Sequence, residues 1–249
     1  MSSCATFEDN ANAARVGDVA LASDDIQALL DSEEPLADGS VVRAELTKWV
    51  RVVLLESANG VAPAEVGSVE NLETRLGDAL NQLADDNLET GRDLYEQGPA
   101  VSGSVCLAGI PLESADDAET VLGDLSSGVS FAEAAATWSS DPGLADSGGV
   151  ILMSDGSECL GVDQVAPELT EQMLTETVGE PFLVDLAGFT TVLLIRAYDE
   201  LADDSKRQLA LAANSTAILP ELVSGADVYI NPRFGYWDAE AAEVLPLGG

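Results

Sequence analysis

The spacing of apolar residues predicts that the first hundred residues are mainly helical. In the ranges 40–59 and 69–88, apolar side chains recur every three or four positions, which is the period of one helix face. Gly60 follows the first range as a stop signal. A short β-element is predicted over 15–21, and residues 91–99 are interpreted as the end of the second helix and a linker.

The pattern changes after residue 100. Short β-rich runs alternate with amphipathic helical segments, and turn signals bracket a loop over 141–149. After Ala202 a helix resumes to about Leu222, and the chain ends with an extended tail over 228–237. The predicted strands lie at 102–107, 181–184 and 190–196, and the predicted helices at 114–125, 131–138 and 168–176. We therefore predict an α+β fold with a small antiparallel sheet in the middle of the chain.

The charge balance excludes several classes of function. The chain carries 45 acidic and 10 basic residues and no histidine, for a net charge of −35. Such a surface repels phosphate backbones, so we expect no nucleic-acid partner. Without histidine, Ser-His-Asp catalysis, Cys-His catalysis and histidine-based zinc sites are excluded, and we expect neither a metal nor a cofactor. The acidity fits either work in saline surroundings, where ions screen self-repulsion, or simple solubility.

The cysteines leave alternatives open. Residues 1–4 are similar to the end of a bacterial lipobox, so Cys4 is a candidate lipidation site; alternatively it is an ordinary terminal residue. An exported lipoprotein would leave Cys106 and Cys159 to form a disulfide, and the alternative is two buried free thiols. The three cysteines form no CxxC pair, so the sequence does not indicate a cysteine-based metal site. No apolar run reaches the length of about 18 residues that spans a bilayer, so we expect membrane contact only through a lipid on Cys4.

Several ordered motifs lie in the segment 101–197. Residues 128–149 run from G-V-S-F through S-S-D-P-G to G-G, residues 165–169 read V-A-P-E-L, residues 178–182 read V-G-E-P-F, and residues 188–192 read G-F-T-T-V. In this order and register they resemble the parvulin (PpiC-type) peptidyl-prolyl isomerase domain. The resemblance implies a parvulin-like α/β domain with a small antiparallel sheet.

The flanking segments extend the resemblance. A helical domain precedes the parvulin-like segment, a helix returns after it, and residues 231–238 read N-P-R-F-G-Y-W-D. These features are similar to the SurA/PrsA-type extracytoplasmic foldases, especially to actinobacterial members, in which cysteines like Cys106 and Cys159 recur. The implied domains are a tether over 1–14, a helical SurA N-like chaperone domain over 15–100, the parvulin domain over 101–198, and a C-terminal helix and extended tail over 199–249 that packs on the helical domain.

The catalytic positions of that family are not intact in this chain. By the resemblance, the two active-site histidine positions are Gly109 and Thr190, and Asp141 lies in the loop where some parvulins have a cysteine or an aspartate. Pro111 also removes a strand N–H donor. The polar centre of the family's site is therefore expected to be largely missing.

The substrate pocket implied by the resemblance is apolar and is formed by Val165 and Leu169, with Phe189 nearby. Prolyl isomerisation needs no nucleophile, because its barrier of about 18–20 kcal/mol comes from amide resonance. The barrier falls when a pocket holds the proline and favours the twisted amide. The alternative for Val165 and Leu169 is a place in the core, and for Asp141 a turn-forming role before Pro142.

Three hypotheses follow. The first is a lipid-anchored extracytoplasmic foldase with a degenerate isomerase site, which binds unfolded or proline-containing secreted polypeptides. In it, Trp49 and the aliphatic stripes form an apolar cradle, unless the stripes simply pack on one another. The segment 101–197 has 16 acidic residues and one base, so basic or neutral clients suit it better. The second hypothesis is a competent prolyl isomerase with a His-free site formed by Val165, Leu169, Phe189, Thr190 and Asp141. The third is a non-catalytic surface interaction lipoprotein.

Overall fold

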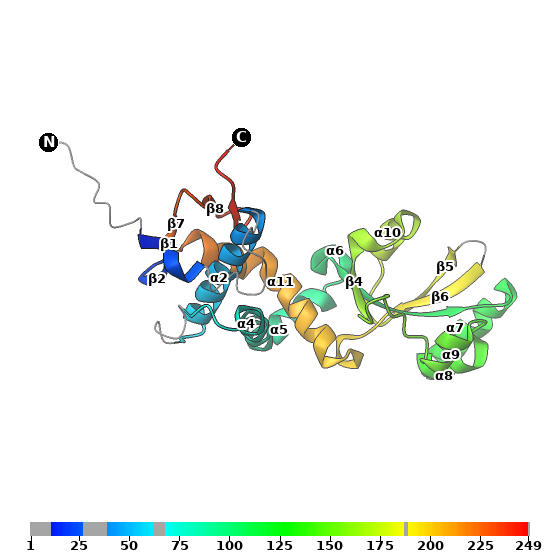
Figure 1. The fold of residues 1–249 in the computed structure, drawn as a ribbon. Helices are drawn as coiled ribbons and strands as arrows, with labels where there is room; N and C mark the ends of the chain where they lie inside the picture. Colours follow the sequence, from blue (N-terminus) through cyan, green and yellow to red (C-terminus); the bar gives the residue numbers. More distant parts are fainter. Residues whose placement is uncertain (1–10, 27–38, 62–67, 187–188, 249) are drawn as a thin grey trace. The chain divides into compact units, whose positions relative to one another are not determined.

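The computed structural model describes residues 11–26, 39–61, 68–186 and 189–248. The chain forms two compact units: unit 1 comprises residues 1–86 and 214–249, and unit 2 comprises residues 87–213 (Figure 1). The functional boundaries predicted at residues 14, 100 and 198 stay predictions. Cys4 and the first ten residues of the predicted tether lie outside the described residues.

Unit 1 contains a three-stranded antiparallel sheet in the order β2-β1-β7. Strands β1 (Asn12–Val16) and β2 (Val19–Ala22) form a hairpin at Gly17, whose φ of +55° is the left-handed conformation that favours glycine. Strand β7 (Val228–Ile230) pairs with the other edge of β1. The β-element predicted near the start of the chain and the tail predicted to be extended therefore meet in one sheet.

Two long helices of unit 1 lie close to their predicted ranges. They are α2 (Gly39–Ala58) and α4 (Leu72–Asp86). Further along the tail, β8 (Tyr236–Asp238) and β9 (Glu243–Leu245) form a two-stranded antiparallel sheet. Strand β9 is tied to α2, because the Val244 N–H donates to the Thr47 hydroxyl oxygen at 2.9 Å.

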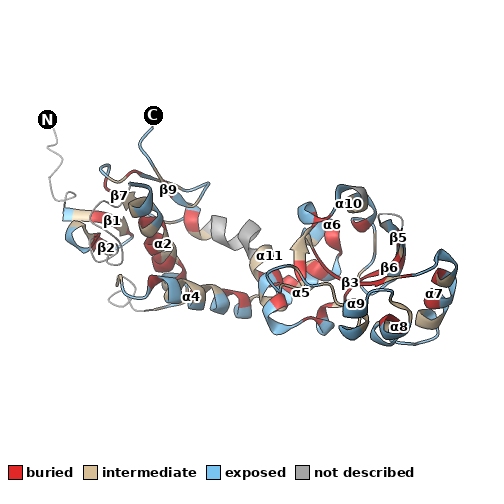
Figure 2. Cartoon of the chain, turned by 45° about the vertical axis from the view of Figure 1, so that its right-hand side comes forward, coloured by how far each residue is buried: buried red, intermediate tan, exposed pale blue. Residues whose placement is uncertain are grey.

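The core of unit 1 contains the inner face of α2 (Figure 2). Leu46, Trp49, Val50 and Val53 are fully buried there, and the alanines of β1 belong to the same cluster. The four α2 positions follow the i, i+3, i+4, i+7 spacing of one helix face, so the helical period that predicted the element also predicts which face is buried. The alternative that the stripes pack internally therefore holds for Trp49, which is inaccessible to any client.

Unit 2 is built on a four-stranded antiparallel sheet in the order β4-β3-β6-β5. The central strands are β3 (Ser104–Pro111) and β6 (Phe189–Ile195), and the edge strands are β4 (Cys159–Gly161) and β5 (Pro181–Leu186). The predicted fold class, α+β with a small antiparallel sheet, is confirmed. Strand β3 runs past the predicted range 102–107, and β4 was not predicted, since three residues carry no readable alternation.

Helices cover both faces of this sheet. Helices α7 (Ala118–Ser126) and α8 (Phe131–Trp138) pack on the face that carries Ile110 and Val192. Helix α10 (Pro167–Met173) packs into the cluster on the opposite face. Helix α8 begins with a capping box in which Ser130 and Glu133 bind each other's backbone N–H groups, which explains why its predicted bounds match.

Residues 91–99 correct one prediction. Instead of a helix end and a linker, they form most of α5 (Leu88–Glu96) and the start of α6 (Pro99–Ser102). The predicted loop over 141–149 likewise contains a short helix, α9 (Pro142–Asp146). Among the described residues the other helical elements are α11 (Asp203–Ser224) and the 3-10 helices Ser23–Asp25, Ala115–Asp117, Val162–Gln164 and Tyr198–Glu200.

Candidate functional site

The two predicted histidine positions lie on opposite faces of the unit 2 sheet. In the antiparallel pairing of β3 and β6, Gly109 is opposite Leu193, and Pro111 is opposite Thr191. Successive residues of a strand point to opposite faces, so Thr191 shares the face of Gly109 and Thr190 does not. Thr190 instead donates its hydroxyl hydrogen to Asp185 on β5 at 3.0 Å. Gly109 and Thr190 therefore do not meet on one face of the sheet, and their assignment to the two histidine positions of the family stays a prediction.

The face beside Gly109 is filled by apolar side chains. A β-carbon placed on Gly109 would lie 3.2 Å from both the Ile151 Cδ1 and the Leu193 Cδ2 atoms. The Gly109 N–H donates to the Gly149 carbonyl at 2.7 Å, so the backbone is also engaged. An imidazole at this position would have to displace these two side chains. The packing explains why a glycine, rather than a polar residue, fits here.

An open hollow lies at the end of this face. It has a volume of about 390 Å³ and is lined by Pro111, Asp141, Phe189 and Thr191, together with Ser140 and Pro142. Phe189 is 62% exposed, which is unusual for an aromatic ring outside an interface. The Phe189 position predicted as substrate-binding thus borders a concave surface, beside the loop residue Asp141.

Asp141 is used structurally in this arrangement. Its Oδ1 atom accepts hydrogen bonds from the Gly143 N–H at 2.7 Å and the Leu144 N–H at 3.1 Å, which makes it the N-cap of α9. The alternative interpretation, a turn-forming residue before Pro142, therefore describes its contacts. The carboxylate remains exposed at the rim of the open hollow.

Val165 and Leu169 are not part of the open hollow, as far as the described residues define its lining. Val165 is buried within the hydrophobic cluster under β3 and β6, and the half-buried Leu169 packs against that cluster. The sequence-based site therefore divides into a core pair and a surface residue, Phe189. The role of these three residues in substrate binding stays a prediction.

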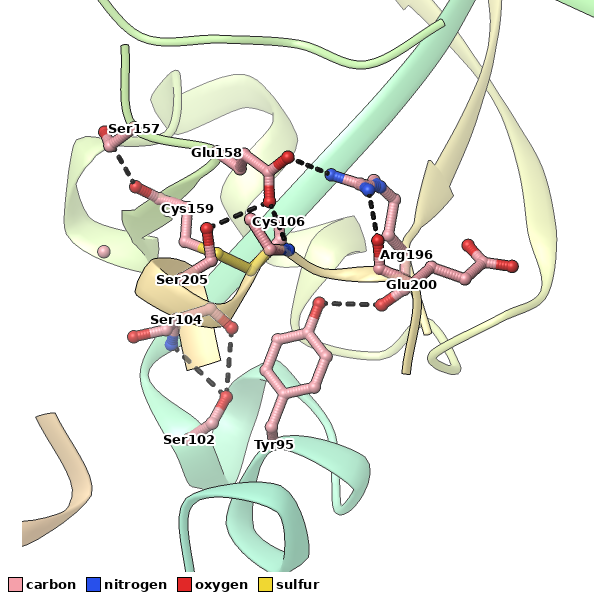
Figure 3. The surroundings of a disulfide bond; sticks show 12 residues. Tyr95, Ser102, Ser104, Cys106, Ser157, Glu158, Cys159, Arg196, Glu200 and Ser205 are labelled. Atoms are coloured by element: carbon pink, nitrogen blue, oxygen red, sulfur yellow. Dashed lines mark hydrogen bonds and ion pairs between the residues drawn. A yellow bond between two sulfur atoms is a disulfide. The ribbon is translucent and has the colours of Figure 1, made fainter. Parts of the chain in front are cut away.

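The Cys106 and Cys159 side chains form a disulfide between β3 and β4 (Figure 3). Both residues are almost completely buried, and they belong to the central cluster of unit 2. The bond joins positions 53 residues apart in the chain. The structure therefore contains the disulfide and not the alternative of two buried free thiols.

A buried polar network lies next to the disulfide (Figure 3). Glu158 accepts hydrogen bonds from the Ala202 N–H at 3.1 Å and the Ser205 hydroxyl at 2.9 Å, and its Oε1 lies 3.3 Å from Arg196 Nη1. Burial alone would raise the pKa of Glu158, but these hydrogen bonds and the Arg196 charge outweigh it and lower the pKa. The Tyr95 hydroxyl donates to the Arg196 carbonyl at 2.9 Å, and burial raises the pKa of Tyr95.

This network is structural in character. Its carboxylate and its guanidinium are mostly buried, and each is engaged by the other and by hydrogen bonds. A general acid or base has to reach a substrate. Nothing in this cluster borders the open hollow, as far as its lining is described.

Unit 1 contains an apolar cavity that the sequence did not locate. Its volume is about 290 Å³, and half of its lining residues are leucines from α2 and α4. The lining residues are Arg51, Leu54, Leu55, Leu76, Leu80, Leu222, Val223 and Ala242. The leucine stripes of the two helices were a signal for it, but the wall contributed by Leu222, Val223 and Ala242 comes from residues far away in the chain.

The described residues give no sign of a membrane-spanning helix or of a metal centre. No helix among them is long and apolar enough to cross a bilayer. No group of three or more cysteine, aspartate or glutamate side chains among them is arranged to hold a metal ion.

Comparison with known proteins finds similarity only among solved structures. No family model matches the chain, and no curated protein matches it. PrsA from Bacillus subtilis has a TM-score of 0.34 and 18% identity, covering 87% of this chain and 91% of that one. The peptidylprolyl isomerase PrsA from Bacillus cereus has a TM-score of 0.33 and 15% identity, and the match covers 89% of this chain and 95% of that one. The foldase PrsA from Streptococcus pneumoniae has a TM-score of 0.32 and 12% identity, and the match covers 86% of this chain and 91% of that one. At these values the activities of those proteins are not transferred to this chain.

Proposed function

We propose that this chain is an extracytoplasmic folding factor that binds unfolded secreted polypeptides through the apolar cavity of unit 1. Its unit 2 is a parvulin-like domain of the SurA/PrsA type with weak or absent isomerase turnover. A lipid on Cys4 anchors it to the cell membrane. The observation that carries the proposal is the leucine-walled cavity of unit 1.

The disulfide supports the compartment. Disulfides form and persist in oxidising surroundings and are rare in reducing ones. The bond between Cys106 and Cys159 therefore favours a protein that folds outside the cytoplasm. A chain that works there meets newly secreted polypeptides before they have folded, and these expose apolar side chains.

The cavity matches such clients in chemistry and strength. A leucine or phenylalanine side chain that leaves water for an apolar wall gains about 1.5–3 kcal/mol. One such contact gives weak, reversible binding, which allows a client to be released and to fold. The walls come from Leu54, Leu76 and Leu80, which are only partly buried by the protein itself.

The reduced isomerase activity follows from the sheet face in unit 2. The hydrogen-bonding pair implied by the family is replaced by Gly109, packed under Ile151 and Leu193, and by Thr190 on the other face. Catalysis requires interactions that are stronger in the transition state than in the ground state. Apolar packing at Gly109 supplies no donor for a twisted amide.

The test is suppression of client aggregation by the full chain. Unfolded, reduced client protein is diluted into buffer, and light scattering is recorded with wild type, Leu80→Asp and Leu152→Asp. Leu80 lines the cavity, whereas Leu152 is 56% exposed in unit 2, so both variants lose a leucine and gain one charge. We expect Leu80→Asp to lose suppression and Leu152→Asp to retain it. Circular dichroism establishes that both variants are folded.

Two outcomes contradict the proposal. One is a wild-type protein that does not reduce scattering at any ratio to client. The other is equal suppression by wild type and Leu80→Asp, which would remove the cavity from the binding site. Equal loss in both variants would trace suppression to net charge instead of the cavity, and it also counts against the proposal.

A second candidate function rests on Phe189. Its exposed ring borders the open hollow beside Pro111 and Thr191, which suits a proline ring held against an aromatic face. The measurement is cis–trans isomerisation of short alanyl-prolyl peptides by wild type, Phe189→Ala and Leu169→Ala. Acceleration that is lost in Phe189→Ala supports isomerase activity at the open hollow, and loss in Leu169→Ala alone supports the core pair. No acceleration by folded wild type removes this candidate.

A further inference from the structure

A second hollow adjoins the apolar cavity of unit 1, and its lining is basic. We call it the basic hollow; it has a volume of about 380 Å³ and shares Arg51 and Leu76 with the apolar cavity. Arg43, Lys48 and Arg51 of α2 all line it, so three of the ten basic residues of the chain lie together. Glu243 is the one carboxylate in its described lining. Carboxylates of Glu45, Glu73 and Glu243 lie beside Lys48 and Arg51, so the uncompensated positive charge of this lining is that of one residue, Arg43.

Two of the three cations are already paired. The Lys48 ammonium lies 2.8 Å from a Glu73 oxygen and 3.1 Å from a Glu45 oxygen. Arg51 lies 3.6 Å from Glu243. These contacts partly neutralise Lys48 and Arg51 and occupy some of their hydrogen-bond donors, so both bind an added anion less well.

Arg43 differs from its neighbours. Among the described residues it has no ion-pair or hydrogen-bond partner, and it is half-buried. Its Nη1 atom lies 3.1 Å from the position that a β-carbon on Gly39 would occupy, so the guanidinium lies close to the backbone of the first turn of α2. Its planar set of donors is thus free to bind a carboxylate in a two-pronged geometry.

We propose that unit 1 selects client segments in which a large apolar side chain lies within a few residues of a carboxylate. The apolar side chain enters the apolar cavity, and the carboxylate binds Arg43 in the adjoining basic hollow. The inference rests on the proposed function and specifies the class of its clients. Arg51 and Leu76, which line both hollows, mark the path between the two contacts.

The overall negative charge does not prevent this selection. Repulsion between exposed charges is screened beyond a Debye length of about 8 Å at physiological ionic strength, and sooner in more saline surroundings. A carboxylate on Arg43 is at hydrogen-bond distance, where a charge-assisted contact outweighs acidic residues farther away. The carboxylates that lie close by, Glu45, Glu73 and Glu243, are already paired with Lys48 and Arg51. Selection by unit 1 thus runs opposite to the basic or neutral preference expected from the 16 acidic residues of the segment 101–197.

The experiment measures binding of short fluorescein-labelled peptides to the full chain by anisotropy. The peptides share a central leucine and phenylalanine and differ only in flanking aspartates, asparagines or lysines. The variants are Arg43→Gln and Arg233→Gln. Arg233 also lies in unit 1 and stacks near the Phe234 ring at 5.7 Å, so both variants lose the same charge.

We expect wild type to bind the aspartate peptide about fivefold more tightly than the asparagine peptide, the range of a partly exposed ion pair. Arg43→Gln abolishes that difference and leaves the affinity for the asparagine peptide unchanged. Arg233→Gln retains the difference.

Other outcomes overturn the inference, and they separate it from the proposed function. Equal binding of the aspartate and asparagine peptides by wild type refutes the acidic preference while leaving client binding intact. Equal effects of the two variants trace the preference to net charge and not to Arg43. Binding of none of the three peptides refutes the proposed function together with the inference. Self-association of wild type in competition with the peptides identifies a second copy of the chain as the occupant.

Discussion

Gly91 of α5 lies directly against Ala210 of α11 in unit 2. A β-carbon on Gly91 would be 2.8 Å from the Cα atom and 2.9 Å from the amide nitrogen of Ala210, closer than a real β-carbon approaches backbone. The contact is between two helix backbones, so no flexible side chain can move to make room. Glycine at this position allows the two helices to pack.

Replacing Gly91 by alanine therefore separates packing from helix propensity. Alanine favours a helix interior by about 1 kcal/mol over glycine, but overpacking a tight contact costs about 1–3 kcal/mol. We expect Gly91→Ala to lower the free energy of unfolding, measured by urea denaturation.

Gly123 is the matched control for this prediction. It lies inside α7 of the same unit, and a β-carbon on it would meet no atom within 4 Å. Gly123→Ala should raise the free energy of unfolding by about 0.5–1 kcal/mol. If the two variants shift stability in the same direction, the close approach of α5 and α11 is not what requires Gly91.

The same glycine shows where sequence reasoning reached its limit. In the sequence Gly91 predicts a helix end, because glycine is a common stop signal. In the structure glycine is required there because Ala210, 119 positions away in the chain, packs against its backbone. Local signals predicted α8 well, since the capping box of Ser130 and Glu133 lies within four consecutive residues. Elements fixed by distant contacts, such as β4, left no local pattern to read.

The candidate site was predictable in its parts but not in its assembly. The resemblance placed Phe189 near a pocket of Val165 and Leu169, whereas in the structure Phe189 lies with Asp141 at an open hollow whose described lining includes neither of those two residues. Sequence motifs do not give the register of β3 against β6. A difference of one residue decides that Thr191 shares the sheet face of Gly109 and that Thr190 lies on the other face. The apolar cavity was missed because part of its wall comes from the end of the chain.

The disulfide of unit 2 should contribute strongly to stability. It closes a loop between positions 53 residues apart, and a bond of this kind contributes about 2–4 kcal/mol, chiefly by restricting the unfolded chain. We expect the double variant Cys106→Ala/Cys159→Ala to unfold at a lower urea concentration than the oxidised wild type. Adding a reductant should lower the wild-type midpoint toward that of the variant and leave the variant unchanged. A wild-type midpoint that does not change with reductant, with thiol titration showing that both Cys106 and Cys159 are free, would contradict the bond.

Glu158 should give unit 2 a pH-dependent component of stability. Its pKa is lowered in the folded state from the ordinary 4.5, so the folded state binds its proton less tightly than the unfolded state. The stabilisation is therefore fully present above about pH 4.5 and is lost as the pH falls through the lower, folded pKa.

The measurement compares wild type with Glu158→Gln by urea denaturation across the acidic range. The stability difference between them should be large near neutral pH and should shrink below about pH 4.5, because wild-type Glu158 becomes protonated there. Glu133→Gln is the comparison at an exposed site, where the pKa is also lowered, by the local Ser130 contacts of a helix cap. Its difference from wild type should shrink on acidification as well, but it should be smaller at neutral pH than that of Glu158→Gln. A wild-type advantage over Glu158→Gln that stays constant with pH would show that the carboxylate charge is not what stabilises this network.

The excess of negative charge predicts that salt stabilises the whole chain. Eight of the ten basic residues already lie in ion pairs, so most of the 45 acidic residues have no cation beside them. Salt weakens the few exposed pairs, each worth at most about 1 kcal/mol, but it also screens repulsion among a much larger number of carboxylates. Since the Debye length falls from about 10 Å at 0.1 M to about 3 Å at 1 M salt, repulsion between neighbouring surface carboxylates largely disappears over this range. We expect the thermal midpoint to rise steadily with potassium chloride. Glycerol at equal osmolality should produce a smaller rise, since it does not screen charge. A midpoint that falls with salt would mean that the ion pairs, and not the repulsion, dominate the electrostatics of this protein.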